Sequence, residues 1–196
     1  ELARRAYGLA RVLHGSGMKP RARVGVLLGK SEKVPVAFHG VFAAGGVLVP
    51  IDPKSPVEQM RRILSSTGAT HLVTESSRGG AVSEVLTSCP DLKAVVGLEA
   101  GTMVVPSVVP WSTVLDEACD TPPDVAVLEV DPAYVLHTSG STGVPKLIQH
   151  THSSAMSFVE WAVREYSLTH HDRLTNHSSH HTCFSTFDYY AAARAA

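Results

Sequence analysis

Strand-like and helix-like segments alternate one by one through the N-terminal half of the chain, and this alternation restricts the possible folds more than any other feature. Apolar, strand-like runs occupy residues 23–28, 47–51, 70–74 and 92–96. Between them apolar residues recur at helical spacing, most clearly at 34–42, where they fall on one helix face. Strands that are joined through single helices run parallel. The sequence therefore predicts an α/β protein with a doubly wound, mostly parallel sheet.

Residues that favour helix ends support these boundaries. Ser31 is expected to cap the helix at 34–42, and Gly45-Gly46 to end it. Residues 55–58, Ser-Pro-Val-Glu, match a capping box with proline at the first helical position. Gly68 stands where a glycine commonly follows a helix end. A helix is therefore predicted between these two signals.

A proline-rich stretch at 97–131 interrupts the alternation. We expect a surface excursion there, with one short helix near 111–118. Residues 1–130 then form a first α/β subdomain that includes this excursion. Residues 131–196 form the start of a second, truncated subdomain.

The second subdomain is predicted to contain strands at 134–138 and 147–150, followed by a helix at 153–166. Trp161, within this helix, is expected to be a packing or surface residue. The buried face of the helix is expected to comprise Ala155, Met156, Val159, Val163 and Tyr166.

Charge and cysteine content exclude several classes of protein. The 196 residues carry 17 Lys and Arg against 18 Asp and Glu, without a basic stripe, so no nucleic-acid partner is predicted. Cys89, Cys119 and Cys183 are odd in number and lack a CxxC spacing, which indicates a reducing compartment and a cytoplasmic location. No apolar run approaches the roughly 18–20 residues that a membrane helix needs, so no membrane partner is predicted.

The most distinctive chemistry lies in residues 138–146, TSGSTGVPK, directly after an apolar run. Gly140 and Gly143 permit backbone conformations that turn successive N–H groups inward, and the hydroxyl groups add further donors. Lys146 supplies a positive charge. Such a loop can surround an anion such as a phosphate group. Neither the Walker A nor the GxGxxG pattern is present, and a solvated Ser/Gly loop with an ordinary surface lysine is the alternative.

The order of residues in this loop resembles the phosphate-binding signature of the adenylate-forming enzymes, which include acyl-CoA synthetases, luciferases and nonribosomal peptide synthetase adenylation domains. FAAGGVLVPIDPKSP at 42–56 and HDRLTNHSS at 171–179 resemble flanking motifs of that family, so the resemblance covers the whole chain. It implies that a carboxylic acid and ATP form an acyl-adenylate and pyrophosphate, with Mg²⁺ sharing the phosphate charge. The acyl group would then pass to the thiol of CoA or a carrier protein.

The resemblance also implies which residues hold the β- and γ-phosphates of ATP: Thr138, Ser139, Gly140, Ser141, Thr142, Gly143 and Lys146. Donors around the leaving pyrophosphate would stabilise the charge that develops in the transition state. No catalytic residue is implied within this chain, because the family's catalytic lysine lies in a later, mobile C-terminal domain. We therefore expect an N-terminal portion of a longer enzyme, inactive without the missing C-terminal part.

The chain departs from the family pattern at two places. Leu147 stands where a third glycine usually follows Pro-Lys. Near the end, aligning the Ala-rich helix places Thr182-Cys183 where amino-acid-activating members have Phe-Asp, whose aspartate pairs with the substrate's α-ammonium group. In that register His181 and Cys183 are acyl-pocket candidates, and an aryl, fatty, β-amino or otherwise modified acid is favoured. A shifted register would instead use Phe187-Asp188.

Three alternatives stay open. The histidines at 170, 171, 177, 180 and 181 invite a zinc site, but their spacing matches no established finger and no metal is predicted. The chain could be a truncated or split, non-catalytic binding module that needs a partner polypeptide. It could also be a generic nucleotide-binding α/β domain, which acid-dependent pyrophosphate exchange would distinguish.

Overall fold

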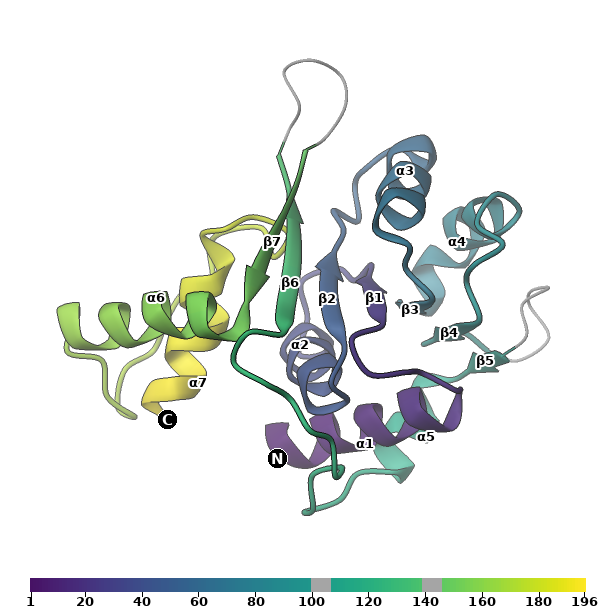
Figure 1. Ribbon diagram of the computed structural model, residues 1–196. Coiled ribbons are helices and arrows are strands. Elements are labelled where there is room, and N and C mark those ends of the chain that lie inside the picture. Colours follow the sequence, from purple (N-terminus) through teal and green to yellow (C-terminus); the bar gives the residue numbers. More distant parts are fainter. Residues whose placement is uncertain (100–106, 139–145) are drawn as a thin grey trace. The chain divides into compact units, whose positions relative to one another are not determined.

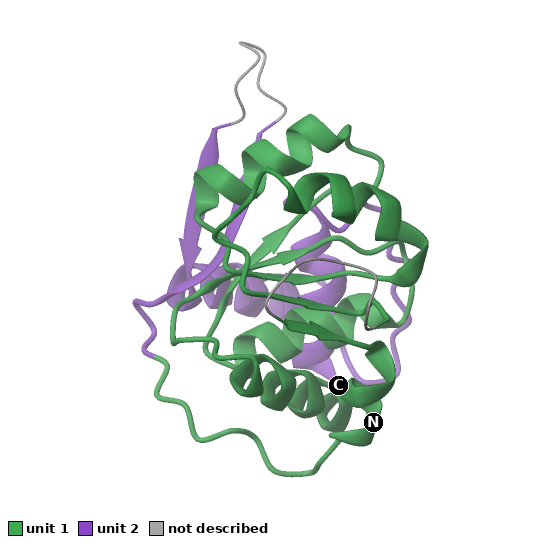
Figure 2. Cartoon of the chain, turned by 90° about the vertical axis from the view of Figure 1, so that its right-hand side faces the viewer, with its two compact units in different colours: residues 1–127 green, residues 128–196 purple. Residues whose placement is uncertain are grey.

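The computed structural model describes residues 1–99, 107–138 and 146–196. The chain forms two compact units, residues 1–127 and residues 128–196 (Figure 2). The division predicted from the sequence, at 130/131, stays a prediction about domains. Each unit is described by itself below.

The first unit contains an all-parallel sheet of five short strands in the order β5-β4-β3-β1-β2. At its centre Val24 of β1 is paired with Leu48 of β2 on one side and with His71 of β3 on the other. The strands are β1 (Arg23–Val26), β2 (Val47–Pro50), β3 (His71–Val73), β4 (Ala94–Val96) and β5 (Ser107–Val109). The predicted parallel α/β sheet is confirmed.

Helices cover both faces of this sheet, and the strand order explains which helix lies on which face (Figure 1). The chain moves from β1 to β2 in one direction and then back across β1 to β3 and β4. Because β-α-β crossovers are right-handed, this reversal moves the connecting helices to the opposite face. The helices are α1 (Leu2–Gly15), α2 (Lys33–Ala43), α3 (Val57–Thr67), the 3₁₀ turn η1 (Ser76–Arg78), α4 (Gly79–Leu86) and α5 (Trp111–Asp116).

Close approach of helices fixes the layer that contains α1. A Cβ atom on Gly40 of α2 would lie 2.7 Å from Cδ2 of Leu9, and a Cβ atom on Gly8 would lie 2.4 Å from the carbonyl oxygen of Val114 in α5. Leu9, Leu13 and Phe38 are fully buried in this layer. Since protein interiors are packed like organic crystals, small residues at these crossings set how close the helices can lie.

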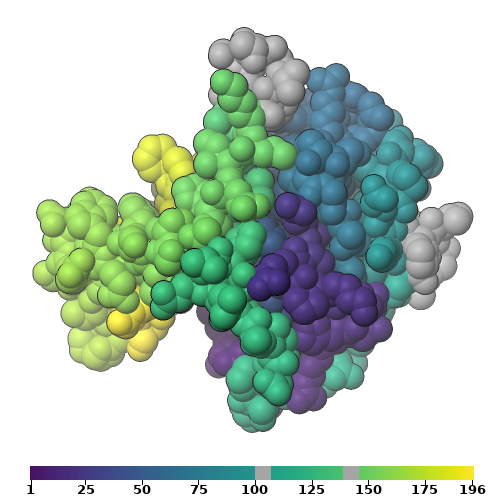
Figure 3. All heavy atoms as spheres, viewed as in Figure 1, coloured from purple at the N-terminus to yellow at the C-terminus, as the bar shows by residue number. Residues whose placement is uncertain are grey.

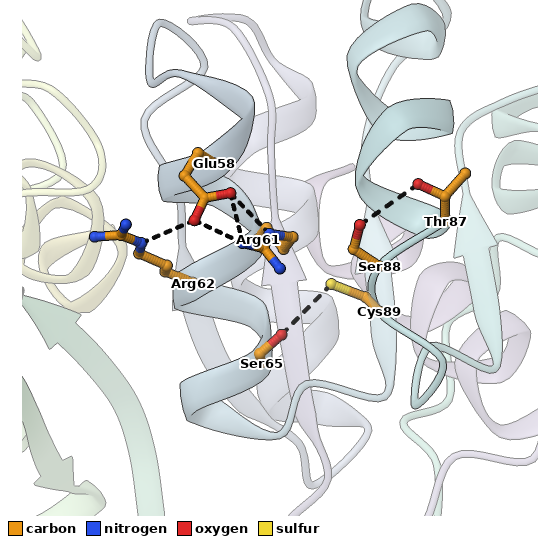
Figure 4. Close-up of polar contacts among 7 residues, drawn as sticks. All are labelled: Glu58, Arg61, Arg62, Ser65, Thr87, Ser88 and Cys89. Atoms are coloured by element: carbon orange, nitrogen blue, oxygen red, sulfur yellow. Dashed lines mark hydrogen bonds and ion pairs between the residues drawn. The ribbon is translucent and has the colours of Figure 1, made fainter.

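The capping box predicted for α3 is wrong, although the helix itself is confirmed. The helix begins at Val57, its N-cap residue is Pro56, and no side chain caps it. Glu58 instead accepts hydrogen bonds from Arg61 and Arg62, one turn further on (Figure 4). Its carboxylate is therefore engaged on the helix surface rather than at the helix end. Gly68, with φ of 63°, ends the helix as predicted.

The start of α2 also differs from the prediction. Its N-cap residue is Glu32, and the hydroxyl group of Ser31 donates to the carbonyl oxygen of Gly29 at 3.4 Å instead of capping the helix. The predicted end is confirmed, because the N–H groups of Gly45 and Gly46 bond to the carbonyl oxygens of Phe42 and Val41.

The stretch predicted as a surface excursion is partly integrated into the first unit. β5 pairs with β4 as an edge strand of the sheet, and this strand was not predicted. The predicted short helix exists as α5, and its Val114 is fully buried. Edge strands of three residues carry too little periodicity to be recognised in a proline-rich sequence.

The second unit contains an antiparallel hairpin and helices that follow it (Figure 1). β6 (Pro132–His137) pairs with β7 (Leu147–Thr151), and β7 leads directly into α6 (His152–Glu165). A capping box joins Thr151 and Ser154 at this point, so that each side chain bonds to the other residue's backbone N–H. The chain ends in a π-helical turn, η2 (Phe187–Ala191), and α7 (Ala192–Ala195).

The buried face predicted for α6 is only partly correct. Val159 is buried as predicted, but its buried partner is Ala162. Met156 and Tyr166 are 43% and 58% exposed. The helix therefore shows a strip of large apolar side chains on its surface instead of burying them.

Candidate functional site

The loop predicted to bind phosphate leaves the hairpin at Thr138 and returns at Lys146. The N–H group of Thr138 donates to the carbonyl oxygen of Lys146 at 3.0 Å, and the N–H group of Lys146 donates to Oγ1 of Thr138 at 3.3 Å. These two bonds close the neck of the loop beyond the last residue pair of the hairpin. Both residues are exposed to solvent. The other predicted phosphate contacts, Ser139, Gly140, Ser141, Thr142 and Gly143, lie outside the described residues.

One face of the hairpin runs from this neck towards α6. Alternate residues of a strand point to the same face, so Tyr134 and Leu136 share a face of β6, and Thr138 follows directly after the strand ends at His137. Their partners across the ladder include His150 and Ile148 of β7. The four residue-to-residue steps from Tyr134 to Thr138 span roughly 13 Å along the strand direction.

A cavity of about 610 Å³ opens on this face. Its wall is formed by side chains from β6, β7, α6 and the segment that precedes α7. The lining residues are Tyr134, Leu136, His150, Ser154, Phe158, Trp161, Tyr166, Cys183, Phe184, Thr186 and Phe187. Cavities of a few hundred Å³ with mostly apolar walls and a few polar groups are typical of small-molecule sites.

Aromatic rings follow one another along the cavity wall. Phe158 and Trp161 have ring centroids 5.8 Å apart, Trp161 and Tyr166 are 6.1 Å apart at 77°, and Tyr166 and Phe187 are 5.4 Å apart at 80°. Edge-to-face contacts at these distances are favourable, because the positive edge of one ring meets the negative face of the next. At the strand side, Tyr134 and His150 stack at 4.8 Å.

The segment that carries Cys183 is held by its own hydroxyl groups. Oγ of the buried Ser185 donates to the carbonyl oxygens of His180 and Thr182, at 3.0 and 2.8 Å. Oγ1 of Thr186 donates to the carbonyl oxygen of Cys183 at 2.6 Å. These bonds fix the turn that presents Cys183 to the cavity. In Figure 3 the C-terminal segment (yellow) emerges on both sides of the light-green surface of α6.

The two acyl-pocket candidates from the sequence lie differently. Cys183 lines the cavity, whereas His181 is not among the lining residues. The ring of His181 lies 6.0 Å from that of His137, whose side chain points to the other face of β6. Asp188, the acidic residue of the shifted register, does not line the cavity, although Phe187 does.

Burial disfavours charge around the cavity. Burial raises the pKa of Tyr134. It raises the pKa of Tyr190 well above its ordinary value. The rings of these two tyrosines stack, with centroids 6.0 Å apart. Burial lowers the pKa of His152, an effect that the nearby Asp131 partly opposes. Both tyrosines and this histidine are therefore neutral near pH 7.

Neither a metal centre nor a membrane span is found where the structure describes the chain. Within residues 1–99, 107–138 and 146–196, no group of three or more His, Cys, Asp or Glu side chains could hold a metal ion. Over the same ranges no helix has the length and apolar character needed to cross a membrane.

Comparison with known proteins identifies the family. The profile of a family described as AMP-binding enzyme matches residues 1–196. The chain belongs to the AMP-binding enzyme family. Among curated relatives in this family, the L-proline–[L-prolyl-carrier protein] ligase of Pseudomonas fluorescens is 31% identical over 83% of the chain. Surfactin synthase subunit 1 of Bacillus subtilis is 33% identical over 88% of it.

Solved structures show the same relationship. The nonribosomal peptide synthetase FmoA3, in its α-methyl-L-serine-AMP bound form, is 31% identical over 98% of the chain with a TM-score of 0.76. ATP-bound MatB from Rhodopseudomonas palustris, at 20% identity and a TM-score of 0.79, shares the fold. The chain spans 31% of the carrier-protein ligase, 4% of the surfactin synthase subunit and 19% of the FmoA3 chain. The predicted adenylate-forming family is thus confirmed.

Sequence reasoning missed most of the cavity wall of this AMP-binding family member. Only Cys183 was a candidate. Trp161 was expected to be a packing or surface residue, and it is 46% exposed and also lines the cavity. The signal that was available is the spacing of Phe158 and Trp161, which lie three residues apart on α6. This spacing is equally typical of two residues buried in the core, and only the fold shows that Phe158 and Trp161 stay exposed.

Proposed function

We propose that the protein activates a carboxylic acid with ATP, forming an acyl-adenylate and pyrophosphate. Family membership and the loop sequence support this function. The observation that carries it is the arrangement on one hairpin face, where the neck of the loop at Thr138 and the apolar cavity at Tyr134 and Leu136 follow one another. An acid whose apolar part occupies the cavity can direct its carboxylate along this face towards the loop.

In this proposal the loop binds the β- and γ-phosphates of ATP through Thr138, Ser139, Gly140, Ser141, Thr142, Gly143 and Lys146. Lys146 is exposed at the neck, where its ammonium group can reach a bound anion. Backbone N–H groups of a glycine-containing loop and a lysine charge together favour the leaving pyrophosphate. Mg²⁺ would enter with ATP and share the phosphate charge.

A second step, transfer of the acyl group to a thiol of CoA or a carrier protein, also belongs to the proposal. It is supported by the name of the 31% identical carrier-protein ligase. The chain spans a minor part of each of the relatives compared here, so residues from elsewhere in the enzyme would complete the site. We expect the 196 residues alone to bind ligands without catalysing adenylation, and the rival function is a binding module that works with a partner polypeptide.

The test uses the native polypeptide that carries this chain, after its mass has been measured. Acid-dependent exchange of labelled pyrophosphate into ATP is compared between the wild type and Lys146→Ala. Loss of a charge-assisted hydrogen bond of about 1.5–3 kcal/mol predicts a roughly 10- to 150-fold slower exchange. Lys19→Ala, an exposed lysine of the first unit, is the matched control and should exchange at the wild-type rate.

The two variants decide the role of the loop. Unchanged exchange in Lys146→Ala would contradict phosphate binding by this lysine. Absence of acid-dependent exchange in the wild-type polypeptide would contradict the proposed reaction and favour the binding module.

A further inference from the structure

The described wall of the cavity in the second unit contains no carboxylate, lysine or arginine side chain. None of its eleven lining residues is Asp, Glu, Lys or Arg. The polar groups are hydroxyl, thiol and imidazole groups, contributed by Tyr134, His150, Ser154, Cys183 and Thr186 among others. An ammonium group that entered this cavity would lose its hydration without gaining a carboxylate partner on this wall, which is unfavourable.

The carboxylate side chains near the cavity either bind another residue or lie outside the cavity wall. On α6, Glu160 accepts a hydrogen bond from Arg194 at 2.7 Å, and Glu165 is exposed at the helix end. Asp188 lies in η2 but does not line the cavity. The described wall therefore offers no carboxylate as a partner for an ammonium group.

The aromatic side chains of the wall are accessible. Phe158 is 39% exposed, Trp161 46%, Tyr166 58% and Phe184 74%. Rings with free faces and edges can continue the series in which Phe158 is tilted against Trp161, and Trp161, Tyr166 and Phe187 meet edge to face. A planar apolar group fits this wall better than a polar or charged one.

Resting on the proposed function, we propose that the cavity selects an acid with an uncharged aromatic side chain and no α-ammonium group. The ring lies between α6 and the segment at 183–187, against Trp161 and Phe184. The carboxylate points along the face of β6 past Leu136, towards Thr138. Cys183 contributes a thiol and not a carboxylate to the wall, so that an amino acid with the same ring finds no partner for its ammonium group and is rejected.

The test is direct binding to the 196-residue chain without ATP. The chain contains two tryptophans, Trp111 and Trp161, so the Trp111→Phe variant reports fluorescence from the cavity alone. Two probes are titrated: 3-phenylpropanoic acid and L-phenylalanine, which differ only by the α-ammonium group. We expect 3-phenylpropanoic acid to quench Trp161 with a Kd at least tenfold lower than that of L-phenylalanine.

Two variants sharpen the test. Cys183→Asp introduces a carboxylate into the wall and should narrow or invert the tenfold preference, whereas Cys183→Ser should keep it. Phe184→Ser removes an exposed ring and should raise the Kd of 3-phenylpropanoic acid severalfold. The urea midpoint of each variant, followed through Trp161, shows that the second unit remains folded.

Equal Kd values for the two probes, or tighter binding of L-phenylalanine, would overturn the inference. So would the absence of quenching at millimolar probe, which would mean that the wall does not bind an aromatic acid. Because no ATP is present, binding with the expected preference supports the cavity even if pyrophosphate exchange fails. Exchange without probe binding would instead leave the reaction standing and remove the cavity from it.

Discussion

Replacing Gly97 by alanine should destabilise the first unit more than any comparable glycine substitution. Gly97 follows β4 with φ of 108°, and a Cβ atom there would lie 1.9 Å from the carbonyl oxygen of Thr74. Its N–H group donates to the carbonyl oxygen of Val109 in β5 at 2.7 Å. The substitution therefore combines backbone strain with a clash between the new Cβ atom and the backbone of Thr74. Both occur where the ends of β3, β4 and β5 lie side by side.

The magnitude follows from these two contributions. A side chain at such a positive φ costs about 1–3 kcal/mol. Relief of an overpacked contact costs about 1–3 kcal/mol, and here the contacting atom belongs to the backbone and cannot rotate away. We expect Gly97→Ala to lower the free energy of unfolding by roughly 2–6 kcal/mol.

Two other glycines separate the contributions. Gly68 has φ of 63° but no heavy atom within 4 Å of a Cβ, so Gly68→Ala should cost only the strain, about 1–2 kcal/mol. Gly80 lies in α4 with neither feature, and Gly80→Ala should be neutral or stabilising by up to about 1 kcal/mol.

Urea unfolding in a Trp161→Phe background measures the first unit alone, because Trp111 of α5 is then the remaining fluorophore. The urea midpoint should be highest for Gly80→Ala, lower for Gly68→Ala and lowest for Gly97→Ala. The slope of the unfolding free energy against urea concentration should be equal for all three variants. Equal midpoints for Gly68→Ala and Gly97→Ala would refute the reasoning, since the carbonyl group of Thr74 would then move aside at no cost.

Two further predictions concern a buried histidine and a buried serine. Burial lowers the pKa of His71, so the folded state keeps it neutral while the unfolded chain binds a proton near pH 6.5. The contribution of neutral His71 to the stability of the first unit should thus be complete above that pH and decline as the pH falls below it. His71→Leu should flatten the pH dependence of the urea midpoint between pH 5 and 7. A wild-type midpoint that is independent of pH would contradict this. Ser185→Ala removes the bifurcated hydrogen bond that the buried hydroxyl group donates to the carbonyl oxygens of His180 and Thr182. It should destabilise the second unit by about 1–2 kcal/mol, measured through Trp161 in the Trp111→Phe background, with an exposed Ser157→Ala as control; equal midpoints for the two serine variants would count against the role given to Ser185.

The sheet of the first unit could be predicted from sequence because several local signals agree there. Strands such as β1 and β2 are continuous apolar runs, since parallel strands are covered on both faces. The left-handed Gly68 marks a helix end that few other residues could form. Where backbone conformation or burial on both faces restricts the choice of residue, sequence and structure correspond.

Features that depend on competition or on distant contacts could not be predicted. Glu58 matched a capping position, yet Arg61 and Arg62 lie one turn away and bind its carboxylate. β5 is three residues long, and only its pairing with β4 makes it a strand. The rings of α6 and the segment at 183–187 form one cavity wall because the tertiary fold brings them together, which helical periodicity alone does not reveal.

Thr151 is both the last residue of β7 and the N-cap residue of α6, so no loop separates the strand from the helix. The five residues of β7 and the 14 of α6 extend roughly 17 Å and 21 Å to either side of this point. Reciprocal bonds between Thr151 and Ser154 hold the joint, so the direction in which α6 leaves the hairpin is fixed at its first turn. The strand residue His150 and the helix residues Phe158 and Trp161 therefore belong to one continuous support, and two walls of the cavity are built from a single uninterrupted segment.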